Sequence, residues 1–233
     1  MPVKVVCDLR HMFGPARDQG MRPTCMAFAA SDAHAAVRPD WAPLSCEFAY
    51  YHALRRDGGK LGDGATLRGM MGALRDDGQP PEEVWPYLST LPANVALWKP
   101  PVGANPLYRR AAGHTRPIIV EILQRLDAGA PVILTMCLSP AFYKPNGDGI
   151  IAASESPDPK RRHAVIAVGH GQHNGERVFL IRNSWGPSWG IDGYAWLSEA
   201  YLAPRLNGLA EMKEDLTNVS AHSNTANVRD SVA

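Results

Sequence analysis

Cysteine, histidine and asparagine side chains can together carry out nucleophilic chemistry, and this sequence contains all three in a favourable arrangement. His163 begins one apolar segment, 163–169, and Asn183 ends the next, 178–183. A turn centred on His173 would pair these segments as antiparallel strands with His163 directly opposite Asn183. Opposed side chains on one face lie roughly 4.5–5.5 Å apart at Cβ. The asparagine carboxamide can then accept a hydrogen bond from one imidazole nitrogen and leave the other nitrogen available.

Cys25 is the strongest candidate for a nucleophile because of its surroundings. It lies at the beginning of an alanine-rich segment, about 24–36, which contains no Gly or Pro and therefore predicts a helix. Pro23 suits the entry to this helix, and Thr24 is the predicted N-cap. The unpaired N–H groups and the positive dipole end of a first helical turn favour an anion, so we expect a lowered thiol pKa. The alternative is that Cys25 is simply a small buried apolar residue.

Together these features resemble the papain family of cysteine peptidases, over most of the chain from about Asp8 to Leu202. The most specific part is the segment 183–194, Asn-Ser-Trp-Gly-Pro-Ser-Trp-Gly-Ile-Asp-Gly-Tyr. Four residues also match the family in order and approximate spacing: Gln19, Cys25, His163 and Asn183. The family's half-cystine near the nucleophile is replaced here by Arg22, so the disulfide that usually holds this loop is expected to be absent.

The resemblance implies an α+β fold with two lobes, a helical left lobe and an antiparallel β-barrel right lobe, and an active site in the cleft between them. We expect residues 1–210 to form one domain, with the helical lobe at about 19–110 and the β lobe at about 1–18 plus 111–210. Residues 211–233 are predicted to form a mobile C-terminal tail, because hydrophobic periodicity fades toward this end of the chain.

The resemblance also implies a role for each site residue. Cys25 and His163 would form a thiolate–imidazolium pair that attacks a peptide carbonyl and gives an acyl-enzyme. Asn183 would orient the imidazole, and Trp185 would cover the hydrogen bond between them. Gln19 and the backbone N–H of Cys25 would donate to the developing oxyanion. Five residues would border the substrate: Gly64, Leu67, Thr135, Ala164 and Trp185.

Periodicity and end signals outline the elements that must position these residues. Helices are predicted at about 24–36, 45–56, 66–77 and 117–128. Ser45 and Thr66 are the predicted N-caps of the second and third helices. Strands are predicted at about 3–6, 131–137, 163–169, 177–183 and 193–198. A proline-rich linker between the lobes is predicted at 91–116. Helices that precede strands along the chain favour an α+β fold.

Composition limits the classes of function. The chain has 233 residues, 45% of them hydrophobic, which is enough for a full core. Its net charge of +1 gives no support for a nucleic-acid partner. The basic run 160–162, beside His163, predicts a solvated turn or a weak preference for acidic substrate residues. No apolar run approaches the roughly 18 residues of a membrane span, so no membrane partner is expected. Cysteine and histidine spacing predicts no metal site, and no cofactor is expected.

Localisation and regulation are expectations from the same sequence features. The first residues do not resemble a signal peptide, and the cysteines lack the family's half-cystine pattern, which fits a reducing compartment. We therefore expect a cytoplasmic protein, or one exported without a cleavable signal peptide. The short segment before Gln19 leaves no room for an inhibitory pro-segment, so a regulatory partner is expected in its place. The partner in catalysis would be a peptide or protein substrate.

Two alternatives to a cysteine-type endopeptidase stay open from the sequence. The same triad would serve an acyltransferase, isopeptidase or amidase, because the acceptor pocket decides among these reactions. The altered loop around Cys25, with Pro23 and Met26, would also suit a non-catalytic binding module on the peptidase fold. Retention of all four catalytic positions argues against that second alternative.

Overall fold

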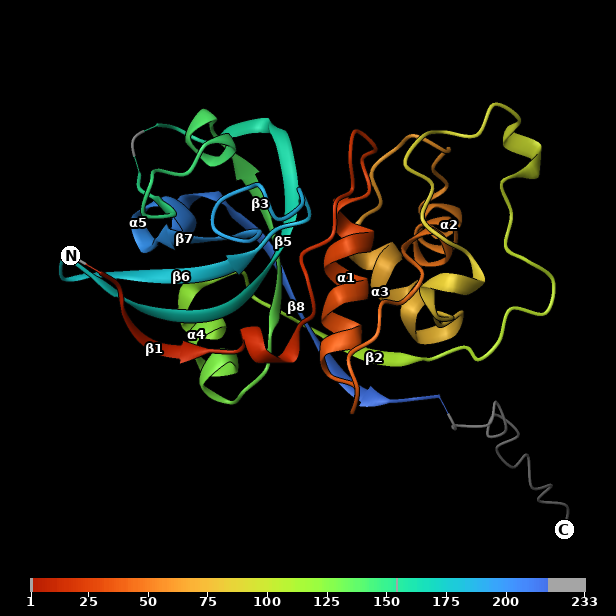
Figure 1. The fold of residues 1–233 in the computed structure, drawn as a ribbon, viewed down its shortest axis with the longest axis horizontal. Coiled ribbons are helices and arrows are strands. Elements are labelled where there is room, and N and C mark those ends of the chain that lie inside the picture. The colour runs from red at the N-terminus through yellow and green to blue at the C-terminus, as the bar shows by residue number, and fades with distance from the viewer. Residues whose placement is uncertain (1, 154, 218–233) are drawn as a thin grey trace, which may run out of the picture.

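Two lobes lie side by side in the computed structural model, which describes residues 2–153 and 155–217 (Figure 1). One lobe is helical and contains α1 (Cys25–Ala36), α2 (Cys46–Asp57) and α3 (Leu67–Asp76). The other holds most of an eight-stranded sheet, with α4 (Ile119–Asp127) and α5 (Glu199–Leu202) packed around it. Short 3-10 helices complete the connections: η1 (Arg10–Met12), η2 (Glu82–Val84), η3 (Val95–Leu97), η4 (Pro140–Tyr143) and η5 (Ala203–Arg205). The expected α+β fold with two lobes is confirmed.

The sheet follows the order β2-β8-β3-β5-β6-β7-β4, and β1 pairs with β5 beside this path. Its strands are β1 (Lys4–Asp8), β2 (Arg110–Thr115), β3 (Val132–Leu138), β4 (Ile150–Ile151), β5 (Asp158–His173), β6 (Glu176–Arg182), β7 (Tyr194–Ser198) and β8 (Leu206–Asp215). β4 pairs in parallel with β7, and the other ladders among the described strands are antiparallel. β5 is the long central strand, and its residues 163–171 are buried on both faces. This explains why its sequence is apolar without alternation.

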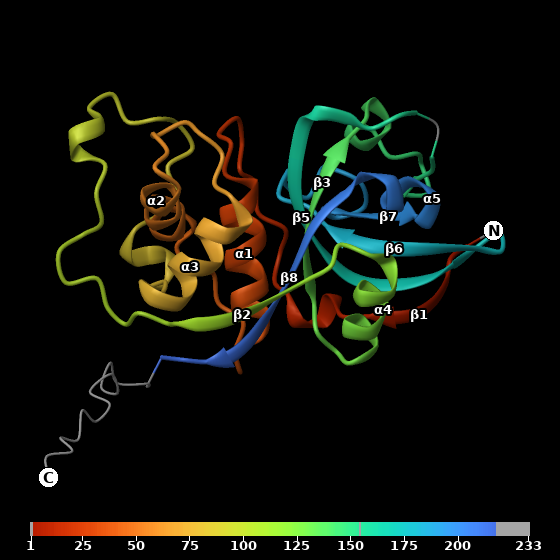
Figure 2. The ribbon, with the colours of Figure 1, turned by 180° about the vertical axis from the view of Figure 1, so that it is seen from behind.

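α1 lies between the other helices and the sheet, as the two opposite views show (Figures 1 and 2). Every residue of α1 after Cys25 is buried, and six of its twelve residues are alanine. Small side chains let the helix approach β5 closely while the helix keeps its favourable alanine propensity. The first residue of α1 is therefore held at the boundary of the two lobes.

The three predicted N-cap residues lie at the helix starts, but only those of α2 and α3 make a side-chain capping hydrogen bond. Ser45 Oγ accepts from the backbone N–H of Phe48, and Thr66 Oγ1 accepts from that of Gly69. Thr24 makes no such bond, because its hydroxyl instead lies 2.9 Å from the Tyr87 hydroxyl. Thr24 thus occupies the predicted N-cap position, but its side chain makes no capping hydrogen bond. Within the described ranges, no helix is both long and apolar enough to cross a bilayer.

Two predicted irregular segments contain strands. The last part of the predicted linker, 91–116, forms β2, which pairs with β8 and runs past α3 toward the helical lobe (Figure 2). Its sequence, Arg-Ala-Ala-Gly-His-Thr, has few large apolar residues and so gave no strand signal. The predicted mobile tail, 211–233, also begins too early, because β8 continues to Asp215 and buries Met212. The remainder of that tail, 218–233, lies outside the described residues.

Candidate active site

The β5–β6 hairpin places His163 and Asn183, but its turn differs from the predicted one. The turn residues are Asn174 and Gly175, with φ of 51° and 82°. An Asn-Gly pair readily adopts this left-handed backbone, which closes a two-residue hairpin. The turn is therefore not centred on His173, and the predicted direct opposition of His163 and Asn183 is wrong.

A bulge in β5 brings the two side chains to one face instead. Next to the turn, His173 pairs with Glu176, whereas beyond the bulge Ile166 pairs with Arg182. The register shifts by one residue between Ala167 and Gly169. Because side chains alternate between faces, a one-residue shift exchanges the face that each residue occupies. Without the bulge, Asn183 would project on the face opposite to His163.

The His163–Asn183 contact defines the protonation of the imidazole. His163 Nε2 lies 2.7 Å from Asn183 Oδ1, and the backbone N–H of Ser184 donates to the same oxygen at 2.8 Å. A carboxamide oxygen only accepts hydrogen bonds, so Nε2 carries the proton and Nδ1 of the neutral ring is an acceptor. Trp185 lies against the imidazole, with ring centroids 4.8 Å apart, and Phe142 contacts it edge-on at 5.7 Å. The ring is fixed by its hydrogen bond and by these aromatic neighbours.

Cys25 and His163 are both shifted toward their neutral forms by burial. Burial raises the pKa of the Cys25 thiol, although backbone groups of Ala164, Met26 and Cys25 act in the opposite direction. Burial lowers the pKa of His163 to about 4, against the effect of the hydrogen bond with Asn183. The sequence led us to expect a lowered pKa for the Cys25 thiol, but this pKa is raised while the imidazole of His163 is neutral. The cost of removing the thiolate from water outweighs the stabilisation that the backbone N–H groups at the start of α1 give to it.

Gln19 is fixed at both ends of its carboxamide. Its Oε1 accepts from Ser184 Oγ at 2.7 Å, and its Nε2 donates to the carbonyl of Arg22 at 2.8 Å. The backbone N–H of Gln19 also donates to the carbonyl of Ser184 at 2.8 Å. A primary amide has two N–H groups, so one of them stays available for a ligand. The N–H groups that begin α1, including that of Cys25, are the other unpaired donors expected at this helix end.

A buried ion pair holds the nucleophile loop, in which no cysteine forms a disulfide. Arg22 donates to Glu47 through both terminal nitrogens, at 2.6 and 2.9 Å, and the two side chains are 3% and 0% exposed. Glu47 also accepts from the backbone N–H of Leu88 and from Trp98 Nε1. All four cysteines of the chain are free thiols. Arg22 and Glu47 were not predicted as a pair, because residues so far apart in sequence carry no local signal of contact.

One cavity of about 530 Å³ connects the predicted residues. Gln19, Cys25 and His163 line it. Asn183 does not line it but is hydrogen-bonded to His163. All five predicted substrate residues line the same cavity: Gly64, Leu67, Thr135, Ala164 and Trp185. The basic run 160–162, which the sequence analysis placed beside His163, lines the cavity too. The sequence missed several further lining residues, namely Met26, Met136, Leu138, Tyr143 and Asn207. Little in the sequence indicates that these residues line the cavity, because the relative placement of their elements depends on tertiary packing and on the sheet register.

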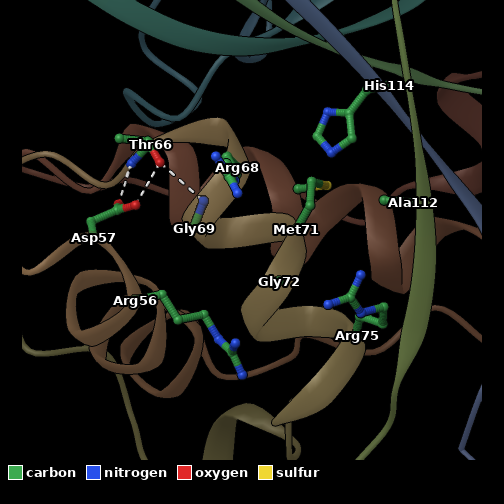
Figure 3. A pocket seen from close by; sticks show the side chains of 10 residues that line it. All are labelled: Arg56, Asp57, Thr66, Arg68, Gly69, Met71, Gly72, Arg75, Ala112 and His114. Atoms are coloured by element: carbon green, nitrogen blue, oxygen red, sulfur yellow. Dashed lines mark hydrogen bonds between the residues drawn. The ribbon is translucent and has the colours of Figure 1, made fainter.

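A larger hollow, of about 950 Å³, lies between the α2–α3 pair and β2 (Figure 3). Arg56, Arg68 and Arg75 border it together with His114. Much of this positive charge is already paired, since Arg56 and Arg75 both form ion pairs with Asp76. The hollow is lined by no cysteine. We therefore place the candidate active site at Cys25.

Comparison with known proteins agrees with this geometry. Residues 115–211, from the end of β2 into β8, match the model for papain family cysteine proteases. Xylellain, a cysteine protease from Xylella fastidiosa, superposes with a TM-score of 0.71 at 24% identity, over 89% of this chain and 85% of that one. The fold of this chain is papain-like. The papain-like fold explains why Cys25 and His163 come from different lobes and line one cavity at their boundary.

The papain-like chain is also similar in sequence to curated cysteine proteases over shorter segments. Mouse cathepsin K is 34% identical over 98 residues, which is 42% of this chain and 26% of that protein. A cysteine protease of Blomia tropicalis is 30% identical over 87 residues, covering 37% of this chain and 26% of the relative. The matched segments thus span about a quarter of the length of these two relatives.

Proposed function

We propose that this papain-like chain is a cysteine peptidase that cleaves peptide bonds through a Cys25 acyl-enzyme. The observation that carries the proposal is the His163–Asn183 hydrogen bond of 2.7 Å inside the cavity that Cys25 lines. It supports the role of His163 because it leaves Nδ1 as an acceptor for the thiol proton. A fixed imidazole beside an otherwise neutral thiol is the arrangement that activates a cysteine nucleophile.

The thiolate and imidazolium form together in this proposal. Burial opposes either charge when it is formed alone, as the pKa directions of Cys25 and His163 show. Transfer of the proton from Sγ to Nδ1 creates both charges at once, and their mutual attraction is strong where water is excluded. The beginning of α1 stabilises the sulfur anion, and Asn183 holds the charged ring in the same orientation.

Acyl transfer then proceeds in two balanced steps. The thiolate attacks the substrate carbonyl carbon, and the oxyanion accepts from the Cys25 backbone N–H and the remaining N–H of Gln19. As the C–N bond breaks, Nδ1 of His163 gives its proton to the leaving amine, and a thioester remains on Cys25. His163 next takes a proton from water, and the hydroxide attacks the thioester. The C–S bond then breaks, the carboxylic acid is released, and the proton on His163 returns to the sulfur to restore the thiol.

The test is a peptide-library digest with the wild-type chain and with Cys25→Ala, analysed by mass spectrometry. We expect new termini with the wild type alone, and the sequences around them report the subsite preferences. Equal cleavage by both proteins, or none by a wild type whose Cys25 reacts with alkylating agents, contradicts the proposal. Added amine nucleophiles separate hydrolysis from the acyltransferase alternative, because transfer gives amide products in place of carboxylic acids.

A further inference from the structure

One wall of the active-site cavity is strongly basic. Lys160, Arg161 and Arg162 line it, all three are exposed, and no Asp or Glu is among the residues that line this cavity. The chain as a whole carries a formal net charge of only +1. Without these three residues the formal net charge would be −2 (+1 − 3), so the net positive charge of the chain depends on this wall of the cleft. Such a local field favours ligands that carry the opposite charge.

The acid nearest to this wall neutralises it only in part. Asp158 lies 3.2 Å from Arg161, and both side chains are well exposed, at 40% and 51%. Exposed pairs of this kind are weak and exchange readily with other partners. Arg162 bonds only weakly, through Nε, to the carbonyl of Pro159 at 3.4 Å. The guanidinium groups therefore keep donors for a carboxylate that enters the cleft.

A row of aromatic rings places Arg161 on the leaving-group side of His163. Trp185 packs on His163 at 4.8 Å, and Tyr143 stacks on Trp185 with centroids 5.3 Å apart and planes at 18°. The guanidinium carbon of Arg161 lies 5.6 Å from the Tyr143 ring centroid. Because His163 donates its proton to the leaving amine, the released half of the substrate lies along this row. A flat Tyr143–Trp185 surface also suits the backbone and side chain of the first released residue.

We infer that Arg161, assisted by Lys160, selects substrates with an acidic side chain, Asp or Glu, at the first residue after the cleaved bond. This inference rests on the proposed peptidase function and names the substrate class for that site. Tyr143 lies against the guanidinium, and Arg161 contacts Asp158 through Nε alone, so its terminal nitrogens can donate to a carboxylate. The contact lies at an exposed wall, so its contribution depends on ionic strength.

The experiment compares two internally quenched peptides that differ only at the residue after the cleaved bond, Asp in one and Lys in the other. Mass spectrometry confirms that both are cut at the same bond. We measure kcat/KM for the wild type, Arg161→Glu and Arg177→Glu at low salt and at about 0.5 M salt. Arg177 is the matched control, because it is 44% exposed on the same lobe and pairs with Glu199 at 2.8 Å, away from the cavity.

For the wild type we expect the Asp peptide to be preferred by about five- to tenfold at low salt, and by about twofold at high salt. Arg161→Glu should reverse the preference, while Arg177→Glu should leave it unchanged. Equal use of both peptides by the wild type, or a ratio that Arg161→Glu leaves unchanged, overturns the inference while leaving the peptidase proposal intact. Failure of the wild type to cleave either peptide, or any peptide of the library, refutes the proposed function and this inference together. Alkylation of Cys25 at the wild-type rate shows that Arg161→Glu is folded.

Discussion

Removing Arg22 tests how the nucleophile loop is held without a disulfide. In Arg22→Met the Glu47 carboxylate, which is fully buried, would keep only the Leu88 N–H and Trp98 Nε1 as donors. Breaking a buried ion pair by removing one partner typically costs about 3–5 kcal/mol, because the other charge stays buried and uncompensated. Total stability of a domain is only about 5–15 kcal/mol, so we expect a large loss.

Urea unfolding measures this loss, and a double-mutant cycle assigns it to the pair. Glu47→Gln should also destabilise the fold, but the double variant Arg22→Met with Glu47→Gln should recover about half or more of the summed loss, since neither charge remains. Arg75→Met is the matched control. Its pair with Asp76 is 60% and 40% exposed, so its effect should stay within about 0.5 kcal/mol.

Two results would refute this reasoning. A loss below about 1 kcal/mol in Arg22→Met would mean that the ion pair contributes no more than an exposed one. Additive effects of Arg22→Met and Glu47→Gln would mean that the two side chains act independently. The carbonyl of Arg22 also accepts from Gln19 Nε2, so we expect the turnover of folded Arg22→Met to fall as well.

Further predictions concern the oxyanion donor and buried histidine. Gln19→Ala should lower kcat by about 10²–10³ while Cys25 is still alkylated at the wild-type rate, and equal loss of both would contradict a donor role. Ser184→Ala removes the bond of 2.7 Å to Gln19 Oε1 and should lower kcat by less than about tenfold in the same assay. Burial lowers the pKa of His34 to about 4, from 6.5, so the unfolded chain binds a proton first as pH falls. Protonation of His34 in the unfolded chain should therefore lower the free energy of unfolding by about 3 kcal/mol as the pH falls from 6.5 to 4. In His34→Gln, urea unfolding at the two pH values should show a correspondingly smaller loss, and an unchanged loss would contradict the reasoning.

The sequence predicted the local elements well because their signals are local. The alanine-rich α1, the capping hydroxyls of Ser45 and Thr66, and the buried strand β5 all depend on neighbouring residues. The predicted hairpin register was wrong because the Asn174-Gly175 turn signal was overlooked and because the bulge near Val168 does not alter the hydrophobic pattern. His163 and Asn183 still meet, since the bulge returns both to one face.

The parts of the site that escaped prediction are those that form between distant segments. Arg22 and Glu47 are one example, and Asn207 on β8 at the cavity is another. The hydroxyl of Thr24, at the N-cap position of α1, contacts the distant Tyr87 hydroxyl and makes no capping hydrogen bond. Strand β2 could not be recognised because it is formed by pairing with β8 and has little apolar pattern of its own.

His163 is proposed to convert Cys25 into a thiolate, and the rate of alkylation at mildly acidic pH reports how much thiolate is present. A neutral haloacetamide is added at pH 5.5, and peptide mapping follows each cysteine in the wild type and in His163→Ala. We predict that Cys25 of the wild type reacts at least about tenfold faster than Cys25 of the variant, and faster than half-buried Cys7, whose pKa is raised by burial. Equal rates at Cys25 in the two proteins would contradict the account.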